Sequence, residues 1–326
     1  MQFDYFVPET LESAAREFMA GDGVALIAGG TDLIPRLKTG VKKTARLLSL
    51  SRIRGLKELT VRGDGLFIGS MITLAELIEN PIVRQHIPIL AESARFVASP
   101  QIRNQGTVGG NLLQERRCQY LNQSDSWREN VSPCFQLGGE VCHQIPSSKV
   151  CRALYYSDLA PVLLAFDAAA EILDENGSRT ISLQELIHNH VAGMKEKFIL
   201  KGILIPQVSP GTWGKFLTAG VRSAIDFALA DVAIRYSPPG LPDEKPQIRI
   251  VLGALSPEPF YLEETAGELA KPGGGLSREK IVESALKEAE SKISPIRETA
   301  VSPGTKKQSL QILKRAMQKL FSVMPS

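Results

Sequence analysis

The chain has 326 residues, of which 43% are hydrophobic and 22% are charged, and its formal net charge is +3 at pH 7. This composition is that of an ordinary globular protein, long enough for two or three domains with cores of their own. The small net charge, without a stripe of Lys and Arg between aromatic residues, excludes nucleic acid as an expected partner. No apolar run approaches the roughly 20 residues that cross a bilayer, so no membrane is expected either.

The first 110 residues alternate helical and strand patterns. The patterns predict a helix, a buried strand, a hairpin and a second helix, over residues 11–19, 24–28, 59–68 and 73–80. The hairpin is centred on Gly63-Asp64-Gly65, where glycine reaches positive φ without steric cost. The second helix begins with a capping-box pattern, Thr73 followed by Glu76.

The rest of the chain predicts a helix, a hairpin, three strands and two amphipathic helices, over residues 158–166, 170–183, 198–205, 227–236, 247–255, 277–289 and 307–321. Residues 206–214 contain two prolines and two glycines and favour a boundary. After this boundary the predicted strands come before the predicted helices, an order typical of a separate α+β domain. We therefore expect one domain over residues 1–211 and another over 212–326.

Two glycine-containing loops are candidates for phosphate binding. The first, residues 27–33, follows a predicted strand and opens into a helix, and the second spans residues 106–111. Glycine pairs in both loops let backbone N–H groups approach a pyrophosphate closely. Each loop alone is more often a plain turn. Neither has the Gly-x-Gly-x-x-Gly pattern of a nicotinamide site, and no Gly-Lys-Thr or Gly-Lys-Ser loop occurs.

All the cysteines of the chain, Cys118, Cys134, Cys142 and Cys151, lie in one segment, separated by 15, 7 and 8 residues. These gaps are too open for the paired Cys-x-x-Cys of a zinc ribbon. Four thiolates on long spacers suit an iron–sulfur cluster, while zinc, disulfides and unlinked thiols remain alternatives. The first 13 residues lack the pattern of a secretory signal, which is a basic start followed by an apolar run. The expected location is therefore cytoplasmic, where disulfides are disfavoured.

Five segments resemble, in order, the FAD-binding medium subunit of the xanthine dehydrogenase and carbon monoxide dehydrogenase family; they are residues 28–33, 69–73, 99–111, 157–161 and 215–228. The resemblance covers nearly the whole chain. It implies an α+β fold, with a two-part FAD-binding domain of the vanillyl-alcohol-oxidase/PCMH-like type. An α+β C-terminal domain of the carbon monoxide dehydrogenase flavoprotein type would follow.

The chain departs from most of that family by about 40 extra residues, within 112–156, that contain all four cysteines. One branch of the family has such an insertion. In this respect the chain resembles the beta subunit of 4-hydroxybenzoyl-CoA reductase, where the insertion holds a 4Fe-4S cluster beside the flavin. Cys118, Cys134, Cys142 and Cys151 match its ligands. His143 follows a cysteine, but four thiols already suffice, so we interpret it as a loop residue.

The resemblance also assigns FAD contacts. In the first loop region they are Ala25, Leu26, Ile27, Ala28, Gly29, Gly30, Thr31, Asp32 and Leu33, and in the second loop Thr107, Val108, Gly109, Gly110 and Asn111. Val97 would pack near the flavin, Gln119 would touch FAD, and Asp158 would contact a cofactor hydroxyl or ring. Lys215 would stabilise negative charge on reduced flavin.

Each of these four isolated residues also has an ordinary interpretation. Val97 would be core, Gln119 an exposed loop residue, Asp158 a helix N-cap and Lys215 a solvated lysine. Arg222 and Asp226, four apart on a possible helix, would form a surface pair. No hydrolytic or other catalytic set is expected on this chain.

The implied function is an electron relay, because a flavin handles one or two electrons and an iron–sulfur cluster one at a time. Reduced ferredoxin would feed the 4Fe-4S cluster, and FAD would pass electrons to 2Fe-2S centres on a small subunit. A molybdenum cofactor on a large subunit would convert 4-hydroxybenzoyl-CoA to benzoyl-CoA, in a heterotrimer that pairs into a dimer. The alternatives are the FAD subunit of a molybdenum hydroxylase oxidising another aromatic or heterocyclic substrate, and a zinc-stapled structural subunit.

Overall fold

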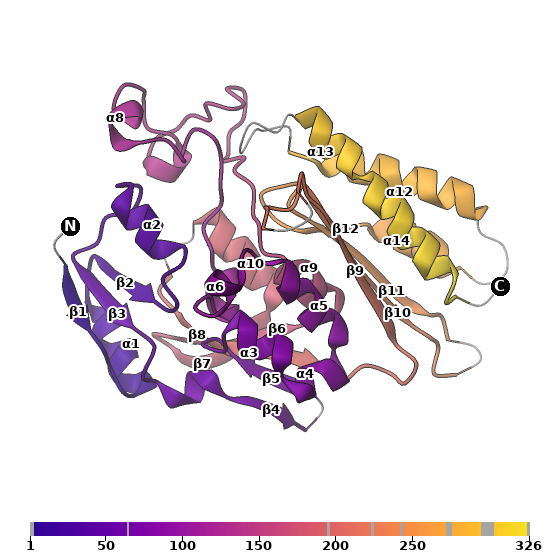
Figure 1. Cartoon of the computed structure of the whole chain (residues 1–326), viewed down its shortest axis with the longest axis horizontal. Coiled ribbons are helices and arrows are strands. Elements are labelled where there is room, and N and C mark those ends of the chain that lie inside the picture. Colours follow the sequence, from indigo (N-terminus) through magenta and orange to yellow (C-terminus); the bar gives the residue numbers. More distant parts are fainter. Residues whose placement is uncertain are drawn as a thin grey trace.

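A computed structural model describes residues 3–63, 65–193, 196–222, 225–241, 244–271, 276–294 and 303–324. Its strands form three sheets, with orders β1-β3-β2, β4-β5-β8-β6-β7 and β12-β11-β10-β9. The sheets follow one another along the long axis of the molecule (Figure 1). The α+β class expected from the sequence is confirmed.

The first sheet is parallel and carries the first glycine loop. It consists of β1 (Asp4–Phe6), β2 (Val24–Ile27) and β3 (Arg46–Ser49), with α1 (Leu11–Ala20) and α2 (Leu33–Lys38) in the connections. Helix α1 is capped by Thr10, whose side chain accepts a hydrogen bond from the Ser13 N–H, 3.1 Å away. The first glycine loop joins β2 to α2.

The second sheet is antiparallel and is the largest. Its strands are β4 (Leu59–Arg62), β5 (Gly65–Gly69), β6 (Ala169–Asp174), β7 (Gly177–Ser182) and β8 (Ile199–Pro206). Both predicted hairpins are present, as β4–β5 and β6–β7. The accompanying helices are η1 (Arg54–Lys57), α3 (Leu74–Glu79), α4 (Pro81–His86), α5 (Pro88–Phe96), α6 (Pro100–Arg103), α7 (Val108–Leu112), α9 (Leu159–Ala165) and α10 (Leu183–Ala192). The predicted capping box at Thr73 and Glu76 starts α3.

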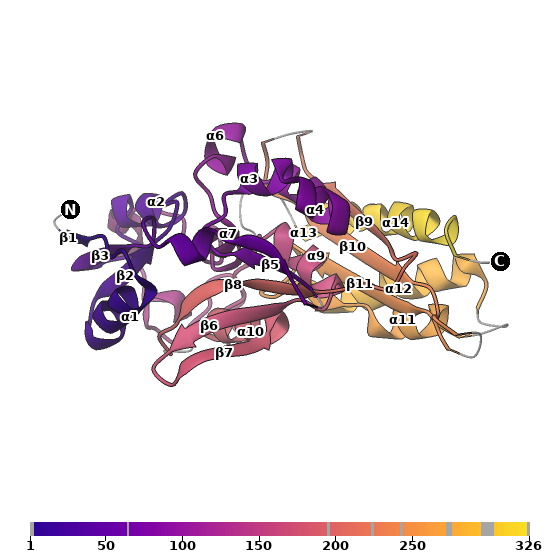
Figure 2. The ribbon, with the colours of Figure 1, turned by 90° about the horizontal axis from the view of Figure 1, so that it is seen from below.

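The third sheet packs between two groups of helices. It contains β9 (Trp213–Ala219), β10 (Ala230–Ser237), β11 (Gln247–Gly253) and β12 (Phe260–Tyr261). Helices α11 (Glu263–Leu269), α12 (Arg278–Lys292), α13 (Pro303–Ser309) and α14 (Gln311–Phe321) complete this end of the chain (Figure 2). Alternate side chains of β10 and β11 point to opposite faces of the sheet. Ala233 and Val251 pack in the core around α5 and α9, whereas Val232 and Ile250 pack in the core beneath α11, α12 and α14.

Three sequence predictions differ from the structure in this region. Strand β9 was not predicted, because it begins within the Pro- and Gly-rich stretch and its apolar and polar residues alternate only weakly. The expected single helix at 307–321 is two helices, which Leu310 separates. Arg222 and Asp226 lie in bends between β9 and β10 rather than on a helix. Their exposed surface pair is present, at 3.3 Å.

The domain boundary at residues 211 and 212 remains a prediction, with β8 ending at Pro206 and β9 starting at Trp213.

The cysteine segment follows the second glycine loop and forms a separate lobe beside α2 (Figure 1). Its two ends are joined by an antiparallel bridge between Arg117 and Leu154. Only α8 (Asp125–Arg128) and η2 (Phe135–Leu137) are regular within it. Among the described residues, no helix is long and apolar enough to span a membrane.

A buried carboxylate joins α11 to α12. Glu288, with 4% of its side chain exposed, accepts hydrogen bonds from the N–H and hydroxyl of Thr265 at 3.0 and 2.8 Å. It also pairs with Lys292 at 3.1 Å. Burial opposes its ionisation, but the bonds from Thr265 and Lys292 outweigh burial and lower the pKa of Glu288.

We predict that Glu288→Ala lowers the free energy of unfolding by about 2–4 kcal/mol, because Thr265 and Lys292 lose a buried charged acceptor. Urea denaturation of the full chain measures this difference. Because the folded pKa is lowered, the difference is full above the ordinary value of 4.5 and is lost as the pH falls through the folded pKa. The control Glu283→Ala, exposed on the same helix, should change stability by less than about 0.5 kcal/mol. Equal effects of the two substitutions would contradict the prediction.

Candidate functional site

The two glycine loops are in direct backbone contact. A Cβ atom at Gly29 would lie 1.8 Å from the carbonyl oxygen of Gln105, directly before the second loop. The next residue, Gly30, has φ = 72°, in the left-handed region that favours glycine. Only glycine at position 29 therefore allows the loops to approach this closely.

The second loop is held against the end of β5. Thr107 bridges to Thr73, and the N–H of Gly109 donates to the carbonyl of Ser70 at 2.8 Å. The Thr107 hydroxyl accepts from the N–H of Gly110 at 3.0 Å and so caps α7. A Cβ at Gly109 would lie 2.8 Å from that of Ser70, so this position is also tightly packed.

A groove of two chambers crosses the loops. The first chamber, about 310 Å³, runs along β2 and β8, and the second, about 300 Å³, lies beneath α6 and the β9–β10 connection. The residues that line both are Thr31, Asp32, Thr107, Gly110 and Gln114. The glycine loops thus form the junction of a two-chambered groove, a shape suited to a dinucleotide.

Most of the residues predicted to bind FAD line this groove. In the first chamber they are Ala25, Leu26, Ala28, Gly29, Gly30, Thr31, Asp32, Leu33, Thr107, Gly109 and Gly110, and the second adds Val97, Asn111 and Asp158. Ile27 and Val108 line neither chamber: Ile27 packs beside Leu37 and Leu47, and Val108 is buried in the main core.

Two other predicted residues lie away from the groove. Gln119 is exposed, and its carbonyl accepts from the side chain of Gln123 at 2.9 Å. Lys215 lies on β9, where its ammonium pairs with Glu92 of α5 at 2.6 Å. Neither residue lines a chamber. Their contacts with FAD remain predictions that this arrangement of side chains does not favour.

Asp158 lines the second chamber with a carboxyl group whose ionised form is disfavoured. Burial raises the pKa of Asp158 well above its ordinary value, and the neighbouring carboxyl of Asp231 on β10 raises it further. Asp158 does not cap α9, because the Ser157 hydroxyl accepts the hydrogen bond from the Ala160 N–H instead. A neutral carboxyl in this position can donate a hydrogen bond to a ligand.

Sequence reasoning missed an ion pair that attaches the cysteine segment to the first loop. Arg117 donates to Asp32 at 2.7 Å, and the Glu115 N–H donates to the other oxygen of Asp32 at 3.3 Å. The Arg117 guanidinium also lies 4.8 Å from the centre of the Phe227 ring, and both residues line the second chamber. The one available signal was a carboxylate inside a glycine loop, a group that needs a cation nearby.

The four cysteines line one small cavity at the base of their segment, together with Tyr120, Gln136 and His143. All four are free thiols. Cys118 accepts from the Leu121 N–H at 3.3 Å, and Cys151 accepts from the Gln136 side chain at 3.5 Å. Hydrogen-bond donors directed at sulfur stabilise thiolate ligands and adjust the potential of an iron–sulfur cluster.

Burial disfavours the thiolate form of two of the four cysteines. Burial, reinforced by the nearby Cys151 and Cys134 thiols, raises the pKa of Cys118 to about 11, although the N–H of Leu121 opposes the rise. Burial also raises the pKa of Cys134. Binding of a metal would therefore release protons.

The space between the four thiols is small. Within the described ranges, no three His, Cys, Asp or Glu side chains are grouped to hold one metal ion. The cavity between the thiols is about 20 Å³, room for about one water molecule, so a cluster requires the loops around it to move apart. His143 stacks on Tyr120, with ring centres 4.1 Å apart, and its Nε2 lies 2.8 Å from the Ser132 carbonyl.

Comparison with known proteins identifies the family. The family described as FAD binding domain in molybdopterin dehydrogenase matches residues 1–208. The chain belongs to this family. It is a FAD-binding subunit of the molybdenum hydroxylase type, and thus an oxidoreductase subunit.

Relatives of known function and solved structures agree with this. The aldehyde oxidoreductase FAD-binding subunit PaoB of Escherichia coli (strain K12) is 30% identical over 285 residues, covering 82% of this chain and 86% of the relative. The glyceraldehyde dehydrogenase medium chain of Sulfolobus acidocaldarius is 24% identical, covering 90% and 89%. The fold is that of carbon monoxide dehydrogenase from Hydrogenophaga pseudoflava, with a TM-score of 0.76 and 22% identity over 100% of this chain and 99% of that one. Quinoline 2-oxidoreductase from Pseudomonas putida 86 gives a TM-score of 0.74 at 20% identity, covering 98% and 96%.

We predict that Gly29→Ala weakens FAD binding by about tenfold or more, a change of about 1.4 kcal/mol. The added Cβ would meet the Gln105 carbonyl and force the two loops apart. Fluorescence titration of the flavin-free chain with FAD measures the affinity. Gly55→Ala is the matched control, because a Cβ there meets nothing within 4 Å. An unchanged affinity in Gly29→Ala would contradict the close contact of the loops.

Proposed function

We propose that FAD lies across the two chambers, with its pyrophosphate at their junction, and that this chain relays electrons between redox centres. The observation that carries the proposal is the meeting of both chambers at the two glycine loops. Backbone N–H groups of glycine loops bind phosphate oxygens. The Thr31 and Thr107 side chains add short polar groups at the same place.

We assign the isoalloxazine to the first chamber and the adenine to the second. Val97, which lines the second chamber, would then lie near the adenine and not near the flavin ring as the resemblance implied. The first chamber shares Phe18, Lys42, Glu115 and Phe198 with a larger cavity of about 1190 Å³ that also reaches Cys151. A redox-active ring there would lie on the side of the cysteine site. The second chamber offers Asp158 as a hydrogen-bond donor and the aromatic side chains of Tyr156 and Phe227, which suit an adenine ring.

We propose further that the four cysteines hold a 4Fe-4S cluster. Such a cluster would exchange one electron at a time, and FAD one or two, so the pair would connect a one-electron donor to a further centre. The chain's own contribution would be the thiolates, the N–H groups directed at them and the fixed position of the segment beside the groove. A reducing, cytoplasmic location accords with four unlinked thiols.

The expected donor is ferredoxin. The cavity beside Cys151 is lined by Lys42, Lys149 and Arg152, and within the described residues these three form no ion pair. An unpaired basic surface attracts an acidic electron-transfer protein and accelerates its encounter.

The organic substrate would be bound by a partner subunit. Relatives are named for aldehydes, nicotine, carbon monoxide and glyceraldehyde, so the FAD subunit does not define the substrate. The cysteine segment favours reductive dehydroxylation of 4-hydroxybenzoyl-CoA, with a molybdenum cofactor on a large subunit and 2Fe-2S centres on a small one. A molybdenum hydroxylase oxidising another aromatic or heterocyclic substrate fits the groove equally well. Anaerobic assay of the complex distinguishes them: 4-hydroxybenzoyl-CoA reoxidises the reduced complex in the first case and leaves it reduced in the second.

We predict that Cys142→Ser abolishes iron and acid-labile sulfide binding, because one thiolate ligand is lost, while FAD stays bound in its separate groove. Metal, sulfide and flavin analysis of anaerobically purified protein measures both cofactors. His143→Gln is the control and should keep the iron, because four thiols suffice without the imidazole. Unchanged iron in Cys142→Ser, or zinc in a colourless wild-type segment, would overturn the cluster proposal and leave the FAD assignment intact.

A further inference from the structure

Helix α2 connects the FAD groove to the cysteine segment through both of its ends. At its start, Asp32 lines both chambers and pairs with Arg117 at 2.7 Å. At its end, the carbonyl of Thr39 accepts a hydrogen bond from Arg128 of α8 at 2.8 Å. One short helix thus contacts the nucleotide groove and the lobe with the cysteines.

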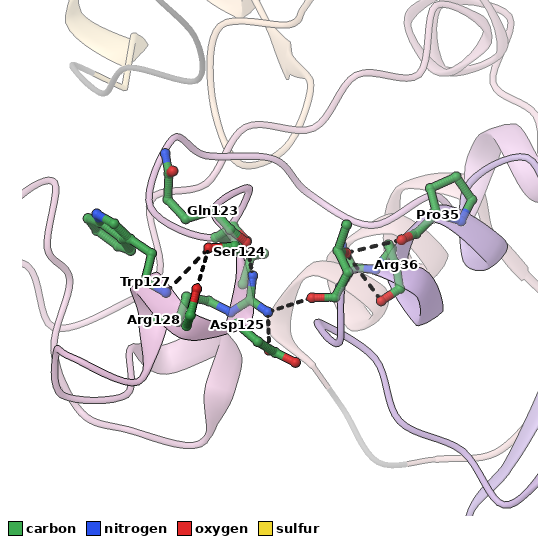
Figure 3. A network of polar contacts seen from close by, with 10 residues as sticks. Pro35, Arg36, Gln123, Ser124, Asp125, Trp127 and Arg128 are labelled. Carbon is green, nitrogen blue, oxygen red and sulfur yellow. Dashed lines mark hydrogen bonds and ion pairs between the residues drawn. The ribbon is translucent and has the colours of Figure 1, made fainter. Parts of the chain in front are cut away.

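Arg128 is buried, and both of its terminal nitrogens donate hydrogen bonds. Its side chain is 5% exposed, and besides Thr39 it donates to the carbonyl of Leu121 at 3.1 Å and to that of Gln123. It also forms an ion pair with Asp125, one turn earlier on α8 (Figure 3). A planar guanidinium with five donors suits such a convergence of acceptors, and no other side chain replaces it.

The α2 side of this contact is equally well fixed. The Thr39 hydroxyl donates to the carbonyls of Pro35 and Arg36, at 3.0 and 3.3 Å. A Cβ at Gly40, where φ is 69°, would lie 1.8 Å from a carboxylate oxygen of Asp125. A side chain at position 40 would therefore displace the Asp125 carboxylate that pairs with Arg128.

Two of the carbonyls that accept from Arg128, those of Leu121 and Gln123, belong to the chain just after the first cysteine. The N–H of Leu121 donates to Cys118 Sγ, and the carbonyl of Leu121 accepts from Arg128. Arg128 therefore fixes the turn that presents Cys118 to the shared cavity. Without it, buried carbonyls lose their donor and the turn loses its attachment to α2.

We propose that Arg128 is a positioning residue that couples the two sites, so that FAD binding stabilises the fold of the cysteine segment through α2. The coupling is reciprocal, because the segment must stabilise the FAD-bound groove by the same factor. The proposal depends on FAD binding in the groove and not on which metal the cysteines hold.

Hydrogen exchange of the full chain, with and without FAD, tests the proposal. In the wild type, FAD should slow exchange about tenfold in α2 and by a similar factor in residues 118–128, a factor typical of coupled sites. In Arg128→Met, FAD should still protect α2, while the protection of residues 118–128 by FAD disappears. Arg54→Met, an exposed arginine on η1, is the control and should behave as the wild type.

Gly40→Ala provides a second variant that leaves the guanidinium in place but displaces the Asp125 carboxylate that pairs with it, and it should weaken the same protection. The proposal is overturned if FAD fails to protect residues 118–128 in the wild type, or if it protects them normally in both variants. Absence of FAD protection in α2 itself would instead contradict the groove assignment, so the two failures are distinguishable.

Discussion

The approach of Gly29 to the Gln105 carbonyl is the constraint on which the remaining structure depends. It allows a parallel three-stranded sheet and an antiparallel five-stranded sheet to bring their loops together without side chains between them. The junction, the two chambers and the exposed backbone donors all follow from this contact. A side chain at position 29 would separate the two sheets and divide the groove.

The other parts of the chain complete the groove from outside. The third sheet packs against α9 and thereby places the buried Asp231 beside Asp158, and the connection before β10 contributes Phe227 to the second chamber. The cysteine segment closes the opposite side, attached by Arg117 to the first loop and by Arg128 to the end of α2. If the cysteines hold a cluster, as we propose, this arrangement would keep it at a fixed distance from FAD.

Local patterns in the sequence predicted local structure well. The capping box at Thr73, the two hairpins and the glycine loops depend on residues close in the chain, and each is present. The family resemblance led to most of the groove, since eleven predicted residues line the first chamber. The placement of Lys215 beside Glu92 could not be predicted in this way, because partners 123 positions apart are set by tertiary packing. The same holds for Arg128 and Thr39, whose contact no spacing rule describes.

Structure determination of the full chain with bound FAD tests the central claim most directly. The account predicts that the pyrophosphate lies at the junction of Thr31, Thr107 and Gly110, with the isoalloxazine along β2 and β8 and the adenine beside Asp158. FAD bound in the large basic cavity, or with both rings in one chamber, would contradict it.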